Sequence, residues 1–175
     1  NSFHCDVTGL LNADGKNNVL AVRLENRPQS SRWYPGAGLY RNVHLVTTER
    51  VHVPVWGTQL TTPHVSAEYA SVRLRTTIRN AGDADVRIST DIIAPDGKIV
   101  ARKDNSRKIN HGQPFEQNFL INAPSLWSPE TPYLYKAVSK IYVDGKQTDE
   151  YTTRFGIRSI EIIADKGFFL SLIHI

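Results

Sequence analysis

The chain has 175 residues, of which 40% are hydrophobic and 22% are charged, and its formal net charge is +4. This length has room for one domain, or for one domain and part of another, and the apolar content is enough for a packed core, which argues against wholesale disorder. No apolar run is long enough to span a membrane, and a lone cysteine excludes an internal disulfide and a thiolate metal cluster.

The first predicted segment, residues 1–48, reads as the last part of a β domain. Its predicted strands and the turn and loop between them cover residues 3–11, 12–16, 18–25, 26–38 and 39–47. Three strands cannot bury both faces of a sheet, so this segment needs partner strands. Cys5 lies in an apolar-flanked strand pattern, which predicts a buried and inert thiol. The chain lacks Met and a basic and apolar leader, so we expect a processed, trimmed or fragmentary chain.

The second predicted segment, residues 49–158, has the strand spacing of a β-sandwich. Its predicted strands are an opening strand at 51–55 or 59–62, followed by 69–79, 85–94, 99–103, 114–121, 133–143 and 147–154. The dipeptide Asp144-Gly145 favours a type I′ hairpin between the last two strands. About seven strands are typical of an immunoglobulin-like sandwich, here held by packing alone because no cysteine pair is available.

The basic residues of this segment do not cluster. Arginines at positions 73, 75 and 79 alternate with apolar residues at 72, 74 and 78, which is the pattern of a strand with one solvated face. We therefore expect no nucleic-acid partner and, without an apolar span, no membrane partner.

Three stretches together resemble the family 2 glycoside hydrolases of the β-galactosidase type. The stretches are NNVLAVRLENRPQSSRWYPGAGLYRNVHL at Asn17–Leu45, LWSPETPYLYKA at Leu126–Ala137 and TRFGIRSIE at Thr153–Glu161. The resemblance implies that residues 1–48 end a sugar-binding jelly-roll domain and that 49–158 form an immunoglobulin-like β-sandwich. It implies that 159–175 begin the junction to a catalytic barrel. The tail at 171–175 departs from the family pattern, and we attribute it to a cloning remnant or a truncated or misread gene end.

The resemblance also implies that the catalytic carboxylates belong to the barrel and not to this chain. Retaining glycosidases need two carboxyl groups about 5–5.5 Å apart. The carboxylates at 25, 83, 85, 96, 144 and 161 fall on exposed strand faces or in turns, and no Asn-Glu dipeptide of the family's acid/base type occurs. We expect no catalytic residue, cofactor or metal ligand, because the six histidines also lack ligand spacing.

The loop that contains Arg32, Trp33 and Tyr34 is the predicted substrate-binding site. An aromatic ring stacks on a sugar face, and a guanidinium supplies paired hydrogen bonds. In the family the matching loop approaches the barrel mouth. The alternative is that Trp33 and Tyr34 only pack the jelly roll against its neighbours. We interpret Trp56 and Trp127 as structural, with Trp127 filling one end of the sandwich.

Two hypotheses for function follow. The first is a non-catalytic accessory region that positions a sugar-binding domain against the barrel of a hydrolase acting on β-linked glycans. The second is a stand-alone carbohydrate-binding or protein-interaction module, including a homodimer formed by strand pairing. The resemblance to exported bacterial enzymes implies a periplasmic or secreted parent, with the cytoplasm as the alternative.

Overall fold

The computed structural model describes residues 2–12, 14–25, 28, 38–79, 82, 84–108 and 113–170, and the backbone of 173–174. Two compact units divide the chain, Asn1–Thr47 and Thr48–Ile175. None of the described helical residues forms a segment long and apolar enough to cross a membrane. The chain is all-β, as predicted, and its only regular structure outside strands in the described ranges is a short 3₁₀ turn, η1 at Thr8–Leu10.

The first unit differs from the prediction, because its described residues form no strand. The stretches predicted as strands at 3–11, 18–25 and 39–47 lack a backbone ladder. A strand is stable only when its amide and carbonyl groups pair with a neighbour, and the described residues of this unit supply no such partners. For the same reason Cys5 is exposed, so the prediction of a buried thiol is wrong. The assignment of this unit to a jelly roll stays a prediction.

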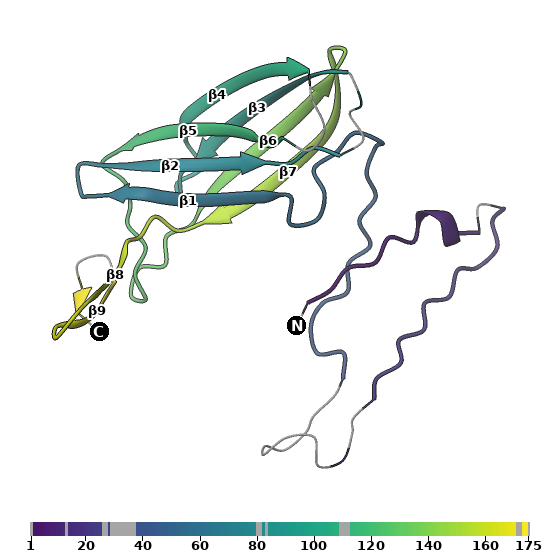
Figure 1. The fold of residues 1–175 in the computed structure, drawn as a ribbon, viewed down its shortest axis with the longest axis horizontal. Coiled ribbons are helices and arrows are strands. Elements are labelled where there is room, and N and C mark those ends of the chain that lie inside the picture. The colour runs from purple at the N-terminus through teal and green to yellow at the C-terminus, as the bar shows by residue number, and fades with distance from the viewer. Residues whose placement is uncertain are drawn as a thin grey trace. The chain divides into compact units, whose positions relative to one another are not determined.

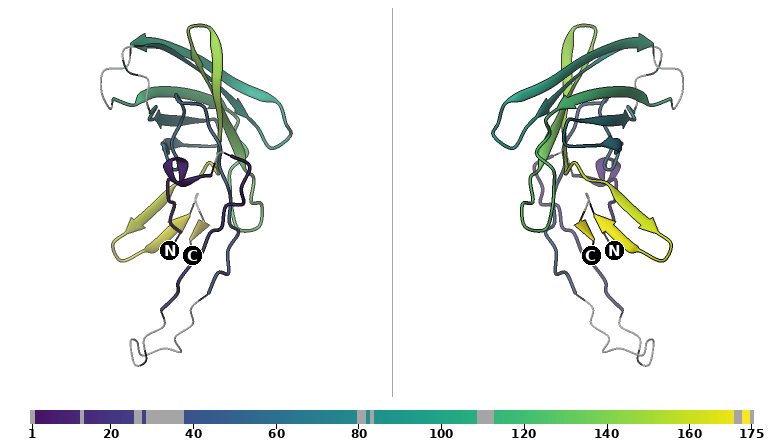
Figure 2. Two further views of the ribbon diagram at one scale, coloured as in Figure 1. Left: turned by 90° about the vertical axis from the view of Figure 1, so that its right-hand side faces the viewer. Right: turned by 90° about the vertical axis from the view of Figure 1, so that its left-hand side faces the viewer.

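The second unit contains a sandwich of two antiparallel sheets, seen edge-on in Figure 2. One sheet has the order β1-β2-β5 and the other β4-β3-β6-β7. The seven strands are β1 Thr58–Val65, β2 Tyr69–Thr76, β3 Asp85–Ile93, β4 Ile99–Lys108, β5 Phe115–Asn122, β6 Tyr135–Val143 and β7 Lys146–Phe155 (Figure 1). The predicted sandwich is therefore confirmed, with β4 extending five residues beyond its predicted end and β1 at the second of its two predicted positions.

The hairpin between β6 and β7 has the backbone that its sequence predicts. Asp144 and Gly145 both have positive φ, 49° and 79°, as a type I′ turn requires. The alternation at Val72 and Leu74 is also confirmed, since both side chains are buried while Arg73 and Arg75 are exposed.

A polar layer divides the core of the sandwich into two apolar clusters. Thr90 on β3, Gln117 on β5 and Ser139 on β6 are each at most 1% exposed. The Thr90 hydroxyl donates to Gln117 Oε1 at 2.7 Å and lies 2.9 Å from Ser139 Oγ. Because a hydroxyl has one hydrogen to donate, Ser139 is the donor to Thr90. The amide nitrogen of Gln117 then donates to the Lys103 carbonyl and to Asn105 Oδ1, both at 3.1 Å.

The two clusters are built from the buried residues on either side of this layer. One contains Ala70, Val72, Leu74, Ile92, Phe119, Ile121, Tyr135, Ala137, Phe155 and Ile157, and the other contains Val53, Ile78, Val86, Ile88, Phe115 and Ile141. Along β3, β5 and β6 the polar residue occupies the central core-facing position, with apolar residues two places before and after it. Gln117 thus links the two sheets through specific hydrogen bonds, which fixes how they face each other.

The first strand also contacts the last strand of the opposite sheet. Thr58 Oγ1 lies 2.9 Å from Thr153 Oγ1 on β7, and the Val53 amide donates to the Asp149 carboxylate at 2.8 Å. The sequence separations are 95 and 96 residues. These bonds close one side of the sandwich.

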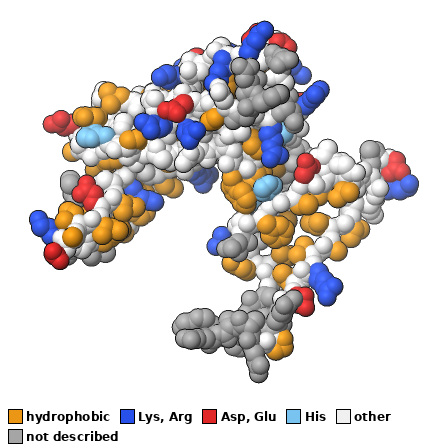
Figure 3. Space-filling view, in the orientation of Figure 1, with side chains coloured by type: hydrophobic (Ala, Val, Ile, Leu, Met, Phe, Trp, Pro, Cys, Tyr) orange, Lys and Arg blue, Asp and Glu red, His pale blue; other side chains and the backbone are white. Residues whose placement is uncertain are grey.

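A small sheet follows the sandwich. Strands β8 Ile160–Ile163, β9 Gly167–Leu170 and β10 Ile173–His174 pair in the order β10-β9-β8. Ile160, Ile162, Ile163 and Phe168 leave apolar surface exposed on the β8–β9 hairpin, which is the orange lobe at the lower left of Figure 3.

Candidate functional site

The predicted sugar-binding residues Arg32, Trp33 and Tyr34 lie outside the described residues. The nearest described part of the same motif is Tyr40 and Arg41. The guanidinium carbon of Arg41 lies 5.5 Å from the centroid of the Tyr40 ring, and Tyr40 is 79% exposed. The motif therefore presents an aromatic ring and a cation at the surface of the first unit, a pair that the sequence interpretation did not single out.

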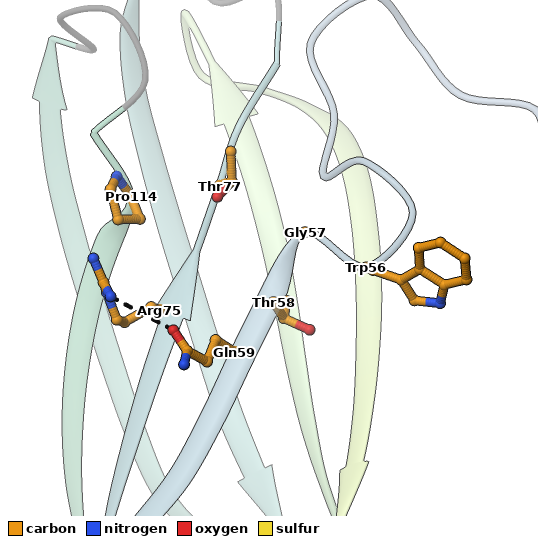
Figure 4. A pocket seen from close by; sticks show the side chains of 7 residues that line it. All are labelled: Trp56, Gly57, Thr58, Gln59, Arg75, Thr77 and Pro114. Carbon is orange, nitrogen blue, oxygen red and sulfur yellow. Dashed lines mark hydrogen bonds between the residues drawn. The ribbon is translucent and has the colours of Figure 1, made fainter. Parts of the chain in front are cut away.

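A shallow hollow of about 210 Å³ lies beside β1 and β2 (Figure 4). It is lined by Trp56, Gly57, Thr58, Gln59, Arg75, Thr77 and Pro114. Arg75 donates to Gln59 at 3.5 Å, and the Trp56 indole points away from the other lining side chains. The lining has neither a carboxylate nor a histidine, so it offers no general acid or base.

Trp56 is largely exposed, which differs from the packing predicted for it. Its side chain is 60% exposed, because Trp56 is the third residue of the tight turn Pro54–Gly57 and has a φ of 59°. The turn is closed by a bond of 2.7 Å from the Gly57 amide to the Pro54 carbonyl. This backbone directs the indole away from the other residues that line the hollow, and the interpretation of Trp56 as structural stays a prediction.

The pKa values of two described carboxylates, Asp91 and Asp96, are shifted in the direction opposite to that of a glycosidase acid. Hydrogen bonds from Arg102 hold the pKa of Asp91 below its usual value, and bonds from Lys98 do the same for the pKa of Asp96. A general acid at neutral pH needs a raised pKa. The predicted exposed carboxylates are exposed where described, at Glu25, Asp85, Asp96, Asp144 and Glu161. Across the described ranges, no three His, Cys, Asp or Glu side chains lie together as a metal site.

The two predicted motifs of the second unit, Leu126–Ala137 and Thr153–Glu161, meet in space. The Trp127 amide donates to the Ile157 carbonyl at 2.9 Å. The rings of Tyr135 and Phe155 stack with centroids 5.6 Å apart, and these residues are direct partners across β6 and β7. The Tyr135 hydroxyl accepts from the Ser125 amide at 2.8 Å, which ties the segment before Trp127 to β6.

Trp127 rests on the segment by which the chain leaves the sandwich. A Cβ atom added to Gly156 would stand 2.8 Å from the indole Cγ and Cδ1, so only glycine fits under the ring. The guanidinium carbon of Arg158 lies 4.7 Å from the ring centroid on the same segment. Ile157, between them, is fully buried in the core. Trp127 is partly buried in this arrangement, which confirms its predicted structural role.

Thr62 holds the same segment from the other sheet. Its hydroxyl donates to the Arg158 carbonyl at 3.0 Å. Residues 156–158 are thus hydrogen-bonded to β1 and to the loop that carries Trp127, and the Ile157 side chain packs in the core. We call this group, Thr62, Trp127, Gly156, Ile157 and Arg158, the exit clamp.

The fold and the exit clamp define an immunoglobulin-like β-sandwich built around two interlocking motifs, and comparison with known proteins gives its family. The model of glycosyl hydrolases family 2 matches residues 52–158, which is more than half of the chain. The chain therefore belongs to glycosyl hydrolase family 2.

Individual relatives extend the similarity over nearly the whole chain. Beta-galactosidase BoGH2A of Bacteroides ovatus is 40% identical over 97% of this chain, and a beta-glucuronidase of Bacteroides fragilis is 29% identical over 99%. The crystal structure of a beta-glycosidase from Bacteroides vulgatus superposes with a TM-score of 0.70 and 27% identity over 81% of this chain. The chain spans 20%, 27% and 18% of the respective lengths of these proteins.

Proposed function

We propose that this chain is a non-catalytic accessory region of a glycoside hydrolase acting on β-linked glycans. In this role the sandwich is a rigid spacer between a sugar-binding domain and a catalytic domain. A spacer works by packing, because fixed contacts at its ends transmit position from one domain to the next. β-Galactosides are the proposed substrates of the parent, on the strength of the similarity to BoGH2A.

The exit clamp is the observation that carries this proposal. The two motifs typical of the family do not form a pocket of reactive groups in the described residues. They hold each other where the chain passes from β7 to β8, through the bond of 2.9 Å between Trp127 and Ile157 and the close approach of Gly156. Such an arrangement serves geometry and not chemistry.

Exchange of the chain into a relative tests the proposal. The segment of BoGH2A that aligns with this chain is replaced by this chain, and hydrolysis of a chromogenic β-galactoside is measured for the chimera and for the purified chain alone. We expect turnover by the chimera and none by the chain. Turnover by the repurified chain, or a folded chimera without activity, would contradict an accessory role.

A stand-alone carbohydrate-binding module is the second proposal, and the exposed Tyr40–Arg41 pair favours it. Galactose or lactose is titrated into the chain while tryptophan fluorescence is followed. A saturable change that disappears in Arg32→Ala supports this module. An accessory region predicts no change, because the other walls of the sugar pocket would come from the parent enzyme.

A further inference from the structure

We propose that Trp127 is a positioning residue, which fixes the direction in which residues 159–170 leave the sandwich. The inference rests on the proposed accessory function and names the part of the chain that performs it. It follows from how the chain is held at Gly156, Ile157 and Arg158, directly before β8.

Each of these three residues is held by a different kind of contact. Gly156 is fixed by steric fit, with the indole only 2.8 Å from where a Cβ atom would stand. The Ile157 carbonyl accepts from the Trp127 amide at 2.9 Å while its side chain is buried. Arg158 contributes its guanidinium to the face of the Trp127 ring and its carbonyl to the Thr62 hydroxyl.

The combination restrains rotation as well as translation of the exit segment. The bonds at Ile157 and Arg158 come from two different elements, the loop of Trp127 and strand β1, so the backbone is held at two consecutive residues and cannot pivot about either one. Dense packing around Ile157 prevents the segment from sliding out of the sandwich. By contrast, the exposed β8–β9 hairpin beyond Arg158 has only four paired residues on each strand. The clamp thus holds the chain directly before β8 begins at Ile160.

The loop that carries Trp127 is itself fixed. Its following residues form a turn in which the Ser128 amide donates to the Thr131 carbonyl at 3.1 Å and the two hydroxyls lie 3.0 Å apart. On the other side, Ser125 is bonded to the Tyr135 hydroxyl. The indole therefore has a rigid base on the four-stranded sheet, from which it holds the exit segment.

Distance measurement between two spin labels tests the proposal on the full chain. Cys5→Ser removes the native thiol, and Lys146→Cys and Glu161→Cys place nitroxide labels at the start of β7 and on β8, both at exposed positions. Pulsed electron paramagnetic resonance then gives the distribution of label distances. We expect a narrow distribution in this background and a shifted or broadened one in Gly156→Ala and Trp127→Ala.

Two matched glycine variants separate positioning from stability. Gly57→Ala introduces an equally close contact, 2.7 Å to Pro54, at a glycine outside the clamp, and Gly9→Ala meets nothing within 4 Å. Gly57→Ala should lower the denaturation midpoint and keep the narrow distribution, and Gly9→Ala should change neither. If Gly156→Ala fails to fold, Arg158→Ala and Arg158→Lys test the proposal instead. We expect Arg158→Ala to broaden or shift the distance distribution and Arg158→Lys to do so less.

The proposal is overturned if the labelled background already gives a broad distribution, or if the folded clamp variants keep its position and width. These results are distinct from a failure of the accessory function. An inactive chimera with a narrow label distribution removes the accessory role and leaves the clamp, whereas an active chimera with a broad distribution removes the clamp alone.

Discussion

At the scale of single residues, the buried polar layer sets this sandwich apart from a wholly apolar core. Gln117 is 1% exposed and engages three of its hydrogen-bonding positions with β3 and β4. A buried polar group costs free energy when a partner is removed, because the group left behind has no water to replace it. Any other packing of the two sheets would leave these buried polar groups without hydrogen-bond partners and would therefore be less stable.

Substitution of this glutamine tests the layer. Gln117→Leu should lower the free energy of unfolding by about 1–3 kcal/mol, since it leaves Thr90 without its acceptor. Thr90→Val in addition should recover part of the loss, because both members of the bond are then apolar. Urea denaturation of the two single variants and the double variant gives the coupling energy. Additive losses would show that the bond contributes nothing of its own.

The ion pair of Asp91 and Arg102 makes stability depend on pH. The guanidinium binds both carboxylate oxygens, and Nη2 lies 2.9 Å from Oδ2. The pKa of Asp91 is lowered in the folded chain, so its contribution to stability is present above the unfolded-state pKa, near 4, and is lost as the pH falls through the folded-state value.

Comparison at two pH values measures this contribution. Asp91→Asn should be less stable than the parent chain at pH 7, and the difference should shrink as the pH falls below about 4. Arg102→Gln supplies the control, because in that background Asp91→Asn should have no pH-dependent effect of this kind. A difference that is the same at pH 7 and pH 3 would mean that the ion pair is not its source.

At the scale of elements, most strands of the sandwich could be predicted because their local patterns agree with their burial. Alternation of apolar residues located β2, β3 and β5, and Asp144-Gly145 located the hairpin. Gln117 shows the limit, since a polar residue at a core-facing position breaks the apolar pattern. Gln117 lies two residues from both Phe115 and Phe119, so it faces the same side of β5 as they do, and this spacing was the signal that it is buried.

Other differences between prediction and structure arise because the outcome depends on contacts with residues that are distant in the sequence. Residues 3–11 and 18–25 have strand patterns but no ladder, and Trp56 is apolar but placed outward by its turn. The exit clamp also joins residues from Thr62 to Arg158, so no single stretch of sequence predicts it. Its parts were recognised only as motifs of the family, without the contact between them.

The turn between β6 and β7 provides the prediction at this scale. Gly145→Ala should lower the free energy of unfolding by about 1–2 kcal/mol, because a Cβ atom is strained at the positive φ of this residue. Gly145→Asn should lower the free energy of unfolding by less, since asparagine tolerates the left-handed region. Thermal denaturation followed by circular dichroism compares the two, and equal losses would point to a cause other than the backbone angle.

At the scale of the whole molecule, the first unit exposes large apolar side chains that can take part in association. Leu20 and Leu45 are 72% and 79% exposed in the first unit. Two of the four edge strands of the sandwich carry protective features, charges on β4 and Pro63 with a register shift in β1. The predicted homodimer by strand pairing stays a proposal, and the exposed apolar residues of the first unit are the surface on which we test it.

Sedimentation velocity at several concentrations tests this proposal. The parent chain should associate as its concentration rises, and Leu20→Lys with Leu45→Lys should keep it monomeric, because the charges oppose burial of that surface. Leu120→Lys, on a residue of β5 that is 58% exposed, is the control and should leave association unchanged. The reverse result would place the interface on the sandwich.

The bonds from Thr58 to Thr153 and from Val53 to Asp149 also determine when this unit folds in a cell. A ribosome adds residues in order, so β1 is made first and its contacts on β7 are made almost a hundred residues later. Until then β2 and β3 have apolar faces without a completed opposite sheet, which is the condition that attracts chaperones. Closure of the sandwich therefore comes near the end of its own translation, and residues 156–158 of the exit clamp follow directly after β7 in the chain.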